Sequence, residues 1–231
     1  MNTNHRDIRA VLFDAGGTLL HLDSLCISSL LRDALNVDIN LDRFRYAQSL
    51  AMSRVAELVA AGAGSTEQLK REFYMTLLPE TGVSKYHLSE AVECAFRLAR
   101  DEMLWRTTEE GTAQVLNDLK TAGYTLAVVS NSDGRIESAF KQAGINDYFD
   151  FFIDSYVVGV EKPDPEIFRL ATERAGMLPK QTAYVGDLYW VDVIGARNAG
   201  LIPILYDPFD FNDAADCLTI RSLSELKTVL E

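Results

Sequence analysis

Four sets of polar residues in this 231-residue sequence are candidates for chemistry, and each stands at or near the end of an apolar segment. They are Asp14, the pair Ser130-Asn131, Lys162 and Asp187. A carboxylate such as that of Asp14 can attack phosphorus and form an acyl-phosphate, which divides one difficult step into two. Asp14 and Asp187 together can hold Mg²⁺, an ion that prefers oxygen ligands. The residue types therefore suit the transfer of a phosphoryl group.

The other candidates suit the binding of that group. Ser130 and the backbone amides after it, beginning at Asn131, can donate to phosphate oxygens, and Lys162 can balance the charge on the transferring group. Asp192 lies five residues after Asp187, where it can support the metal through water or hold Lys162 in place. Taken singly, each residue also has a structural explanation as a turn former, a helix cap or a surface lysine. Their order along the chain is what points to a site.

An alternation of strands and helices must position these residues. Four apolar segments have the composition of buried strands, and they run over 8–13, 124–130, 182–185 and 202–206. Helical segments between them end in Ala-Gly pairs, where glycine supplies the left-handed conformation that ends a helix. This alternation predicts an α/β fold with a doubly wound, mostly parallel sheet and helices on both faces. The carboxyl ends of parallel strands meet at one crevice, so residues far apart in sequence can share a site.

Two helix caps are predicted beside the candidate residues. Ser132 or Asp133 is expected to cap the helix that runs through Ala139. Asp164 followed by Pro165 is typical of an N-cap and a first-turn proline.

A different kind of segment interrupts the alternation. Between Leu22 and Met103 apolar residues recur at the helical spacing, and no strand pattern is evident. The sequence therefore predicts one α/β core, formed by residues 1–20 and 107–231, and an inserted all-helical cap over 21–106. Because the insertion follows the first strand closely, we expect it to lie over the carboxyl edge of the sheet, where open α/β folds bind ligands.

Composition and charge argue against several classes of protein. The net charge of −12 argues against a nucleic-acid partner, because a phosphate backbone needs a basic surface. The three cysteines are far apart and form no CxxC pair, which excludes a zinc ribbon and disfavours a disulfide framework. Residues 1–7 show no leader pattern, and no apolar segment approaches the length of a membrane span. We expect a cytoplasmic protein that binds a small phosphorylated metabolite and no membrane, as a monomer or a homodimer.

In this order the residues resemble the motifs of the haloacid-dehalogenase superfamily, in the branch with a helical cap after the first strand. Residues 13–19, FDAGGTL, look like its first motif, usually DxDxT. Ser130-Asn131 resembles the second motif, Lys162 followed by PDP the third, and residues 186–192, GDLYWVD, the fourth. The resemblance covers the whole core, whereas the cap matches only in position and helical character.

The resemblance implies a role for each matching residue. Asp14 would be the nucleophile, and Thr18 would hydrogen-bond within the nucleophile loop. Ser130 would bind phosphate, and Lys162 would orient Asp14 and balance charge. Asp187 would bind Mg²⁺ together with Asp14. The implied activity is the Mg²⁺-dependent hydrolysis of a small phosphorylated substrate through an aspartyl-phosphate.

Gly16 departs from the family pattern. Its backbone carbonyl would still be a metal ligand, but the family's phosphatases carry a second Asp here, which protonates the leaving oxygen and then activates water. Such acid–base help is typically worth about two to four orders of magnitude in rate. The glycine therefore predicts a weak or specialised phosphatase, unless His21 or Asp23 acts as a substitute acid. Both are also explained as polar hinge residues.

Two other functions remain open. Family members that cleave phosphonates or carbon–halogen bonds also lack the second Asp. The dehalogenases lack the metal-binding pair that this chain keeps as Gly186-Asp187, and phosphonate cleavage needs a cap lysine, for which Lys70 and Lys85 are the candidates. The remaining alternative is a non-catalytic protein that binds phosphate and Mg²⁺ through the same motifs.

Overall fold

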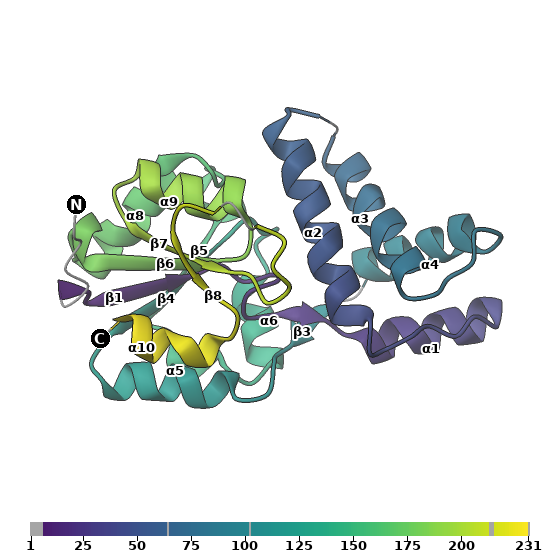
Figure 1. The fold of residues 1–231 in the computed structure, drawn as a ribbon, viewed down its shortest axis with the longest axis horizontal. Coiled ribbons are helices and arrows are strands. Elements are labelled where there is room, and N and C mark those ends of the chain that lie inside the picture. Colours follow the sequence, from purple (N-terminus) through teal and green to yellow (C-terminus); the bar gives the residue numbers. More distant parts are fainter. Residues whose placement is uncertain (1–6, 64, 102, 213–214, 231) are drawn as a thin grey trace. The chain divides into compact units, whose positions relative to one another are not determined.

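The structure is a computed structural model that describes residues 7–63, 65–101, 103–212 and 215–230; the first six residues of the predicted core lie outside the described residues. The chain divides into two compact units (Figure 1). One comprises Met1–Leu20 and Thr108–Glu231, and the other comprises His21–Thr107. Within the described residues, no helix combines the length and the apolar character needed to cross a membrane.

The first unit is built on a six-stranded sheet with strand order β5-β4-β1-β6-β7-β8. The strands are β1 (Ala10–Phe13), β4 (Thr125–Ser130), β5 (Phe151–Asp154), β6 (Thr182–Gly186), β7 (Ile202–Tyr206) and β8 (Leu218–Ile220). All five strand pairings are parallel, so the predicted mostly parallel sheet is confirmed. The central strand β1 places Phe13 beside Val128 of β4 and Val185 of β6. The residues that follow these three strands therefore emerge at one edge of the sheet.

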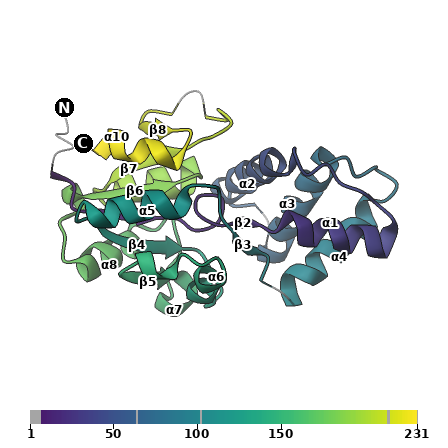
Figure 2. The same ribbon diagram turned by 90° about the horizontal axis from the view of Figure 1, so that it is seen from below.

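Helices cover both faces of this sheet. They are α5 (Thr112–Thr121), α6 (Ile136–Gln142), α7 (Ser155–Val158), α8 (Pro165–Ala175), α9 (Ile194–Asn198) and α10 (Leu226–Leu230). Figure 1 shows α8 and α9 above the sheet and α5 and α10 below it, and Figure 2 views the same fold from below, with α5 in front of the sheet. Because both faces are covered, the central strands β1 and β6 are buried along their whole length. This is the doubly wound α/β fold that the sequence predicts.

Single-turn elements complete the first unit. They are the 3₁₀ turns η2 (Asn146–Tyr148), η3 (Pro179–Gln181) and η5 (Leu223–Glu225), and the π-helical turn η4 (Tyr189–Val193). The turn η4 follows β6 and leads directly into α9, so it carries the segment that follows Asp187.

The second unit consists of four helices and a short ribbon. The helices are α1 (Ser24–Leu35), α2 (Phe44–Ala60), α3 (Thr66–Glu80) and α4 (Leu88–Asp101). Their core contains buried aromatic residues, among them Phe44, Phe73 and Tyr74. The ribbon pairs β2 (His21–Leu22) with β3 (Trp105–Thr107) in antiparallel fashion. The expectation of an all-helical insertion was incomplete, because strands of two and three residues are too short to show a period.

Of the two predicted helix caps, one is confirmed and one is wrong. The carboxylate of Asp164 accepts a hydrogen bond from the backbone of Glu166 at 2.9 Å, with Pro165 as the first helical residue of α8. By contrast, α6 begins after Arg135 without a side-chain cap from Ser132 or Asp133. The carboxylate of Asp133 instead binds the Arg135 guanidinium, so it does not reach the helix.

Candidate active site

Asp14 is held at the carboxyl end of β1 by the neighbouring strand. Its backbone N–H donates to the carbonyl of Val185 at 2.8 Å, and its side chain is buried. The chain then turns sharply, because the backbone N–H groups of Leu19 and Leu20 both donate to the carbonyl of Ala15, at 2.9 and 2.7 Å. This turn brings the motif from Asp14 to Thr18 against the end of β6.

Gly17 and Thr18 both contact Asp187. Thr18 was expected to hydrogen-bond within the nucleophile loop, but its hydroxyl instead donates to Oδ1 of Asp187, after β6, at 3.0 Å. Gly17 has a φ of +96°, and a Cβ at this position would overlap the Asp187 carboxylate. The turn therefore needs glycine at position 17 for two reasons, its left-handed backbone and the closeness of a carboxylate.

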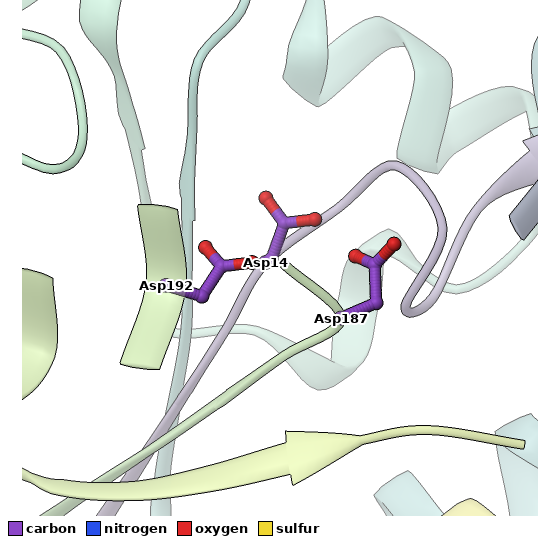
Figure 3. A group of neighbouring side chains, drawn as sticks. All are labelled: Asp14, Asp187 and Asp192. Atoms are coloured by element: carbon purple, nitrogen blue, oxygen red, sulfur yellow. The ribbon is translucent and has the colours of Figure 1, made fainter. Parts of the chain in front are cut away.

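Three carboxylates form the acidic part of the site. Oxygen atoms of Asp14, Asp187 and Asp192 all lie within 4.8 Å of one another, and in the view of Figure 3 Asp14 lies between the other two. Burial raises the pKa of Asp14 to about 6, with the charge of Asp192 adding to the effect and the Lys162 ammonium opposing it. Burial and then the negative charge of Asp14 raise the pKa of Asp187 well above its ordinary value. A cation between these two carboxylates would remove that repulsion.

Lys162 supplies the opposite charge. Its ammonium donates to Oδ1 of Asp14 at 2.5 Å, to Oδ1 of Asp192 at 2.8 Å and to the hydroxyl of Tyr184 at 2.9 Å. Burial alone would lower the pKa of Lys162, but the charges of Asp14 and Asp192 outweigh it and raise the pKa above its ordinary value. The lysine is therefore a permanent cation. Since an ammonium has three N–H donors, each of them has an acceptor here.

Both carboxylate oxygens of Asp192 accept hydrogen bonds from other groups of the protein. Besides the contact with Lys162, its Oδ2 accepts from the backbone N–H of Leu188 at 3.0 Å. A Cβ at Gly186 would overlap the Asp192 side chain, so the conformation of the turn after β6 depends on glycine at that position. Of the two roles considered for Asp192, this geometry favours the one in which it holds Lys162 in place.

Asn131 ties the second and third motifs together. Its side-chain NH₂ donates to the carbonyl of Lys162 at 2.9 Å, and its Oδ1 accepts from the backbone N–H of Lys162 at 2.7 Å. Ser130 precedes it as the buried last residue of β4. The Asn131 side chain thus fixes the backbone of Lys162. The backbone amide of Asn131, which the sequence suggests for substrate binding, lies in the loop after Ser130.

Asp154 is a functional candidate that sequence reasoning missed. It ends β5 opposite Ser130, and its carboxylate accepts from the backbone N–H groups of Gly134 and Tyr156, both at 3.0 Å. Asp154 therefore shapes the loop that follows Ser130, and its Oδ2 also accepts from the backbone N–H of Ile136, the first residue of α6, at 3.5 Å. A signal was present, because the apolar run Phe151–Ile153 ends on this carboxylate as the first strand ends on Asp14.

His21 and Asp23, the residues considered as substitutes for the missing acid at Gly16, both have polar contacts within the protein. Asp23 accepts from the backbone N–H of Cys26 at 2.9 Å as the N-cap of α1, and it forms an ion pair with Arg106. His21 is buried within the helical unit, with Nδ1 3.2 Å from Nε2 of Gln48. Both residues belong to the helical unit, and a role for either as a substitute acid stays a prediction. Lys70 and Lys85 are exposed, whereas lysines that form Schiff bases are activated by burial or a neighbouring cation.

Comparison with known proteins identifies the family. The sequence matches the haloacid dehalogenase-like hydrolase family over residues 8–200, so the chain belongs to this family. It is 31% identical to pyrophosphatase PpaX of Bacillus velezensis, over 84% of this chain and 80% of that protein. It is also 28% identical to (S)-2-haloacid dehalogenase 4A of Burkholderia cepacia, over 96% of this chain and 95% of that one.

Other matches are more local or show the fold alone. The chain is 42% identical to haloacid dehalogenase-like hydrolase domain-containing protein 3 of Mus musculus, but the match spans 40% of this chain and 37% of that protein. The magnesium-bound structure of the HAD-hydrolase YfnB from Bacillus subtilis superimposes with a TM-score of 0.69 at 20% identity, covering 97% of this chain and 99% of that one. The relatives thus include enzymes of more than one chemistry.

Proposed function

We propose that the protein is a Mg²⁺-dependent hydrolase of a small phosphorylated metabolite, with Asp14 as its nucleophile. The observation that carries this proposal is the contact of Lys162 with Asp14, 2.5 Å apart, beside the second carboxylate of Asp187. A nucleophile held by a buried cation, next to a site for a divalent ion, suits the attack of a carboxylate on a phosphorylated substrate. The similarity to a pyrophosphatase supports phosphorus chemistry.

The residues present fit Mg²⁺. Asp14 and Asp187 offer hard oxygen donors. The backbone carbonyl of Gly16, two residues after Asp14, lies in the turn that follows β1. Burial, and after it the negative charges of Asp14 and Asp192, raise the pKa of Asp187, so a cation held between the carboxylates would favour their charged forms. When bound, Mg²⁺ would neutralise charge on the carboxylates and on the phosphoryl oxygens.

The protein groups then perform two displacements. The hydroxyl of Ser130 and the backbone N–H of Asn131 would hold phosphoryl oxygens, while Lys162 keeps Asp14 oriented and balances its charge. The Asp14 carboxylate attacks phosphorus, the bond to the leaving oxygen breaks, and an aspartyl-phosphate forms. Water then attacks phosphorus, which releases phosphate and restores Asp14. Because Gly16 has no proton to give, the first displacement favours substrates whose leaving group needs little protonation, such as acyl-phosphates and activated esters.

The test is a screen of aryl phosphates and phosphorylated metabolites with Mg²⁺ and with excess chelator. We expect phosphate release that depends on Mg²⁺ and falls below a few per cent of wild type in Asp14→Asn, because an amide is a poor nucleophile. Circular dichroism of the variant checks its fold. Unchanged turnover in Asp14→Asn, or in chelator, would overturn the proposal.

A second candidate function is carbon–halogen cleavage. Two observations favour it, the absence of the second Asp at Gly16 and the similarity to a haloacid dehalogenase along 96% of the chain. The same carboxylate of Asp14 would attack carbon and displace halide. The retained carboxylate of Asp187, close to Asp14, argues against it, because it adds negative charge where a haloacid would bring its own. Halide release from 2-haloacids, measured beside phosphate release, separates the two functions.

A further inference from the structure

One buried hydroxyl touches three parts of the site that the motifs do not connect. Tyr184 lies in β6, and its hydroxyl accepts from Nζ of Lys162 at 2.9 Å. The same hydroxyl lies 3.1 Å from the carbonyl of Val129 and 3.2 Å from Oδ1 of Asp192, either of which can accept its proton. It therefore links Lys162 to the end of β4, directly before Ser130, and to the carboxylate that also holds Lys162.

The ring of Tyr184 is fixed independently of these hydrogen bonds. The side chain is 1% exposed, and its ring packs edge-on against Phe168 of α8 with 4.9 Å between the ring centroids. The backbone of β6 pairs with β1 at Leu12 and with β7 at Pro203. A hydroxyl on such a support has little freedom to move, so it offers the Lys162 ammonium an acceptor at a fixed position.

Lys162 needs a fixed acceptor, because its side chain is long and its carboxylate partners alone do not hold the ammonium in one position. Asp14 is proposed to change during the reaction, when its carboxylate becomes an acyl-phosphate and loses its own negative charge. The hydroxyl of Tyr184 and the carboxylate of Asp192 are the two acceptors of Lys162 that take no part in bond making. They can hold the ammonium while Asp14 reacts.

We propose that Tyr184 is a positioning residue for Lys162, whose ammonium it holds in place beside Asp14. The proposal rests on the proposed function for its catalytic consequence, whereas the hydrogen bond itself can be tested without turnover. Removal of the hydroxyl would leave Lys162 with one donor unsatisfied in a buried place, so the ammonium would shift or admit water. Substrate binding through Ser130 and Asn131 would be affected much less than the chemical step.

The test compares Tyr184→Phe with Tyr206→Phe. The control is another buried tyrosine, on the adjacent strand β7, whose hydroxyl donates to Glu109 at 2.7 Å. For Tyr184→Phe we expect kcat on an aryl phosphate to fall about tenfold, the size of one hydrogen bond to a charged group, with KM changed less than about twofold. The control should leave both constants near the wild-type values.

A second readout uses ¹⁵N NMR of the lysine ammonium groups, with the Lys162 signal assigned by its loss in Lys162→Arg. In the wild type we expect slow hydrogen exchange at Lys162 compared with the exposed Lys85, and in Tyr184→Phe an exchange faster by about tenfold or more. If the wild-type protein hydrolyses no phosphate ester, the proposed function fails, and exchange alone decides on Tyr184. Exchange at Lys162 as fast as at Lys85 in the wild type would overturn the positioning role even if the variant did not fold. So would unchanged exchange in the variant, or an unchanged kcat in an active enzyme.

Discussion

The hydroxyl of Thr18 donates a 3.0 Å hydrogen bond to Oδ1 of Asp187, joining two motifs that are 169 positions apart in the chain. Thr18 is completely buried. Its bond acts on a carboxylate that we propose as a metal ligand, so it decides which way that carboxylate faces. Neighbours that orient ligands in this way commonly affect metal affinity as well as fold.

We expect Thr18→Val to weaken Mg²⁺ binding by about tenfold or more, the usual effect of losing a residue that orients a ligand. Valine keeps the size of the side chain but cannot donate to Asp187. Thr18→Ser retains the hydroxyl and is the matched control, which should bind Mg²⁺ nearly as well as the wild type. Isothermal titration calorimetry gives the three dissociation constants. Equal affinity in all three proteins would show that the bond has no effect on the metal.

The raised pKa values of Asp14 and Asp187 predict how stability depends on pH. A carboxyl whose pKa is higher in the folded than in the unfolded state binds protons more tightly when folded. Its contribution therefore favours folding at low pH, and it is lost as the pH rises through the folded value, which for Asp14 is about 6. Asp187→Asn removes one of the two charges. We expect this variant, without metal, to melt at a higher temperature than the wild type at about pH 8, and the difference to shrink towards about pH 5.

Mg²⁺ should counteract the loss of wild-type stability at high pH. In the wild type, the ion competes with protons for the carboxylates, so it should raise the melting temperature more at about pH 8 than at about pH 5. Asp187→Asn should respond little at either pH. Thermal melts with Mg²⁺ and with chelator measure both effects. A wild-type protein whose metal-free stability rises between about pH 5 and about pH 8 relative to Asp187→Asn would contradict the repulsion between these carboxylates.

Gly17 and Gly123 provide a matched pair of substitutions. Their φ angles are +96° and +90°, so alanine strains both backbones to a similar degree, on the order of 1 kcal/mol. A Cβ at Gly123 meets nothing within 4 Å, whereas one at Gly17 overlaps Asp187. We expect both variants to lose stability, and Gly17→Ala alone to lose Mg²⁺ binding and turnover. Equal activity of the two variants would mean that the turn can move away from Asp187 without consequence.

Gly16→Asp tests whether a missing acid limits the rate. If it does, the aspartyl-phosphate on Asp14 should form faster than it hydrolyses in the wild type and accumulate as one added phosphoryl group by intact mass. The substitution should raise turnover of aryl phosphates by up to about 10²–10⁴-fold, the usual contribution of a placed acid–base group. A circular-dichroism melt checks that the loop tolerates the side chain. A folded Gly16→Asp protein that binds Mg²⁺ and gains nothing would indicate that another residue already supplies the proton.

Much of the core architecture follows from local sequence patterns. The runs before Asp14, Ser130 and Asp187 predict strands, and a parallel sheet necessarily brings strand ends together, so the meeting of these residues could be expected. Both edge strands were missed. The three residues of β8 give too short a pattern, whereas β5 is as long as β1 and ends on a carboxylate in the same way, a signal that was overlooked.

The choice of partners within the site could not be predicted in the same way. Asn131 was expected to bind phosphate through its backbone amide, and nothing in the sequence predicts that its side-chain amide pairs with the backbone of Lys162. Tyr184 looks like an ordinary aromatic residue of a buried strand, and its contact with Val129 spans 55 positions. Such pairings depend on distances across the sheet, which no local period contains. Side-chain partners were therefore the part that needed the structure.

The central place of β1 in the sheet has a consequence for how the chain folds during synthesis. The strand β1, which directly precedes Asp14, is made first, but its neighbours begin only at Thr125 and Thr182. Every residue of the helical unit, His21–Thr107, is made before either neighbour exists. As the ribosome supplies the chain from its N-terminus, the helical unit can assemble from local contacts while β1 is still unpaired, before β4 and β6 have been made. Asp14 thus reaches its final surroundings only after residue 192 has been added, and a chain truncated before residue 162 would carry Asp14 without Lys162, Asp187 and Asp192 beside it.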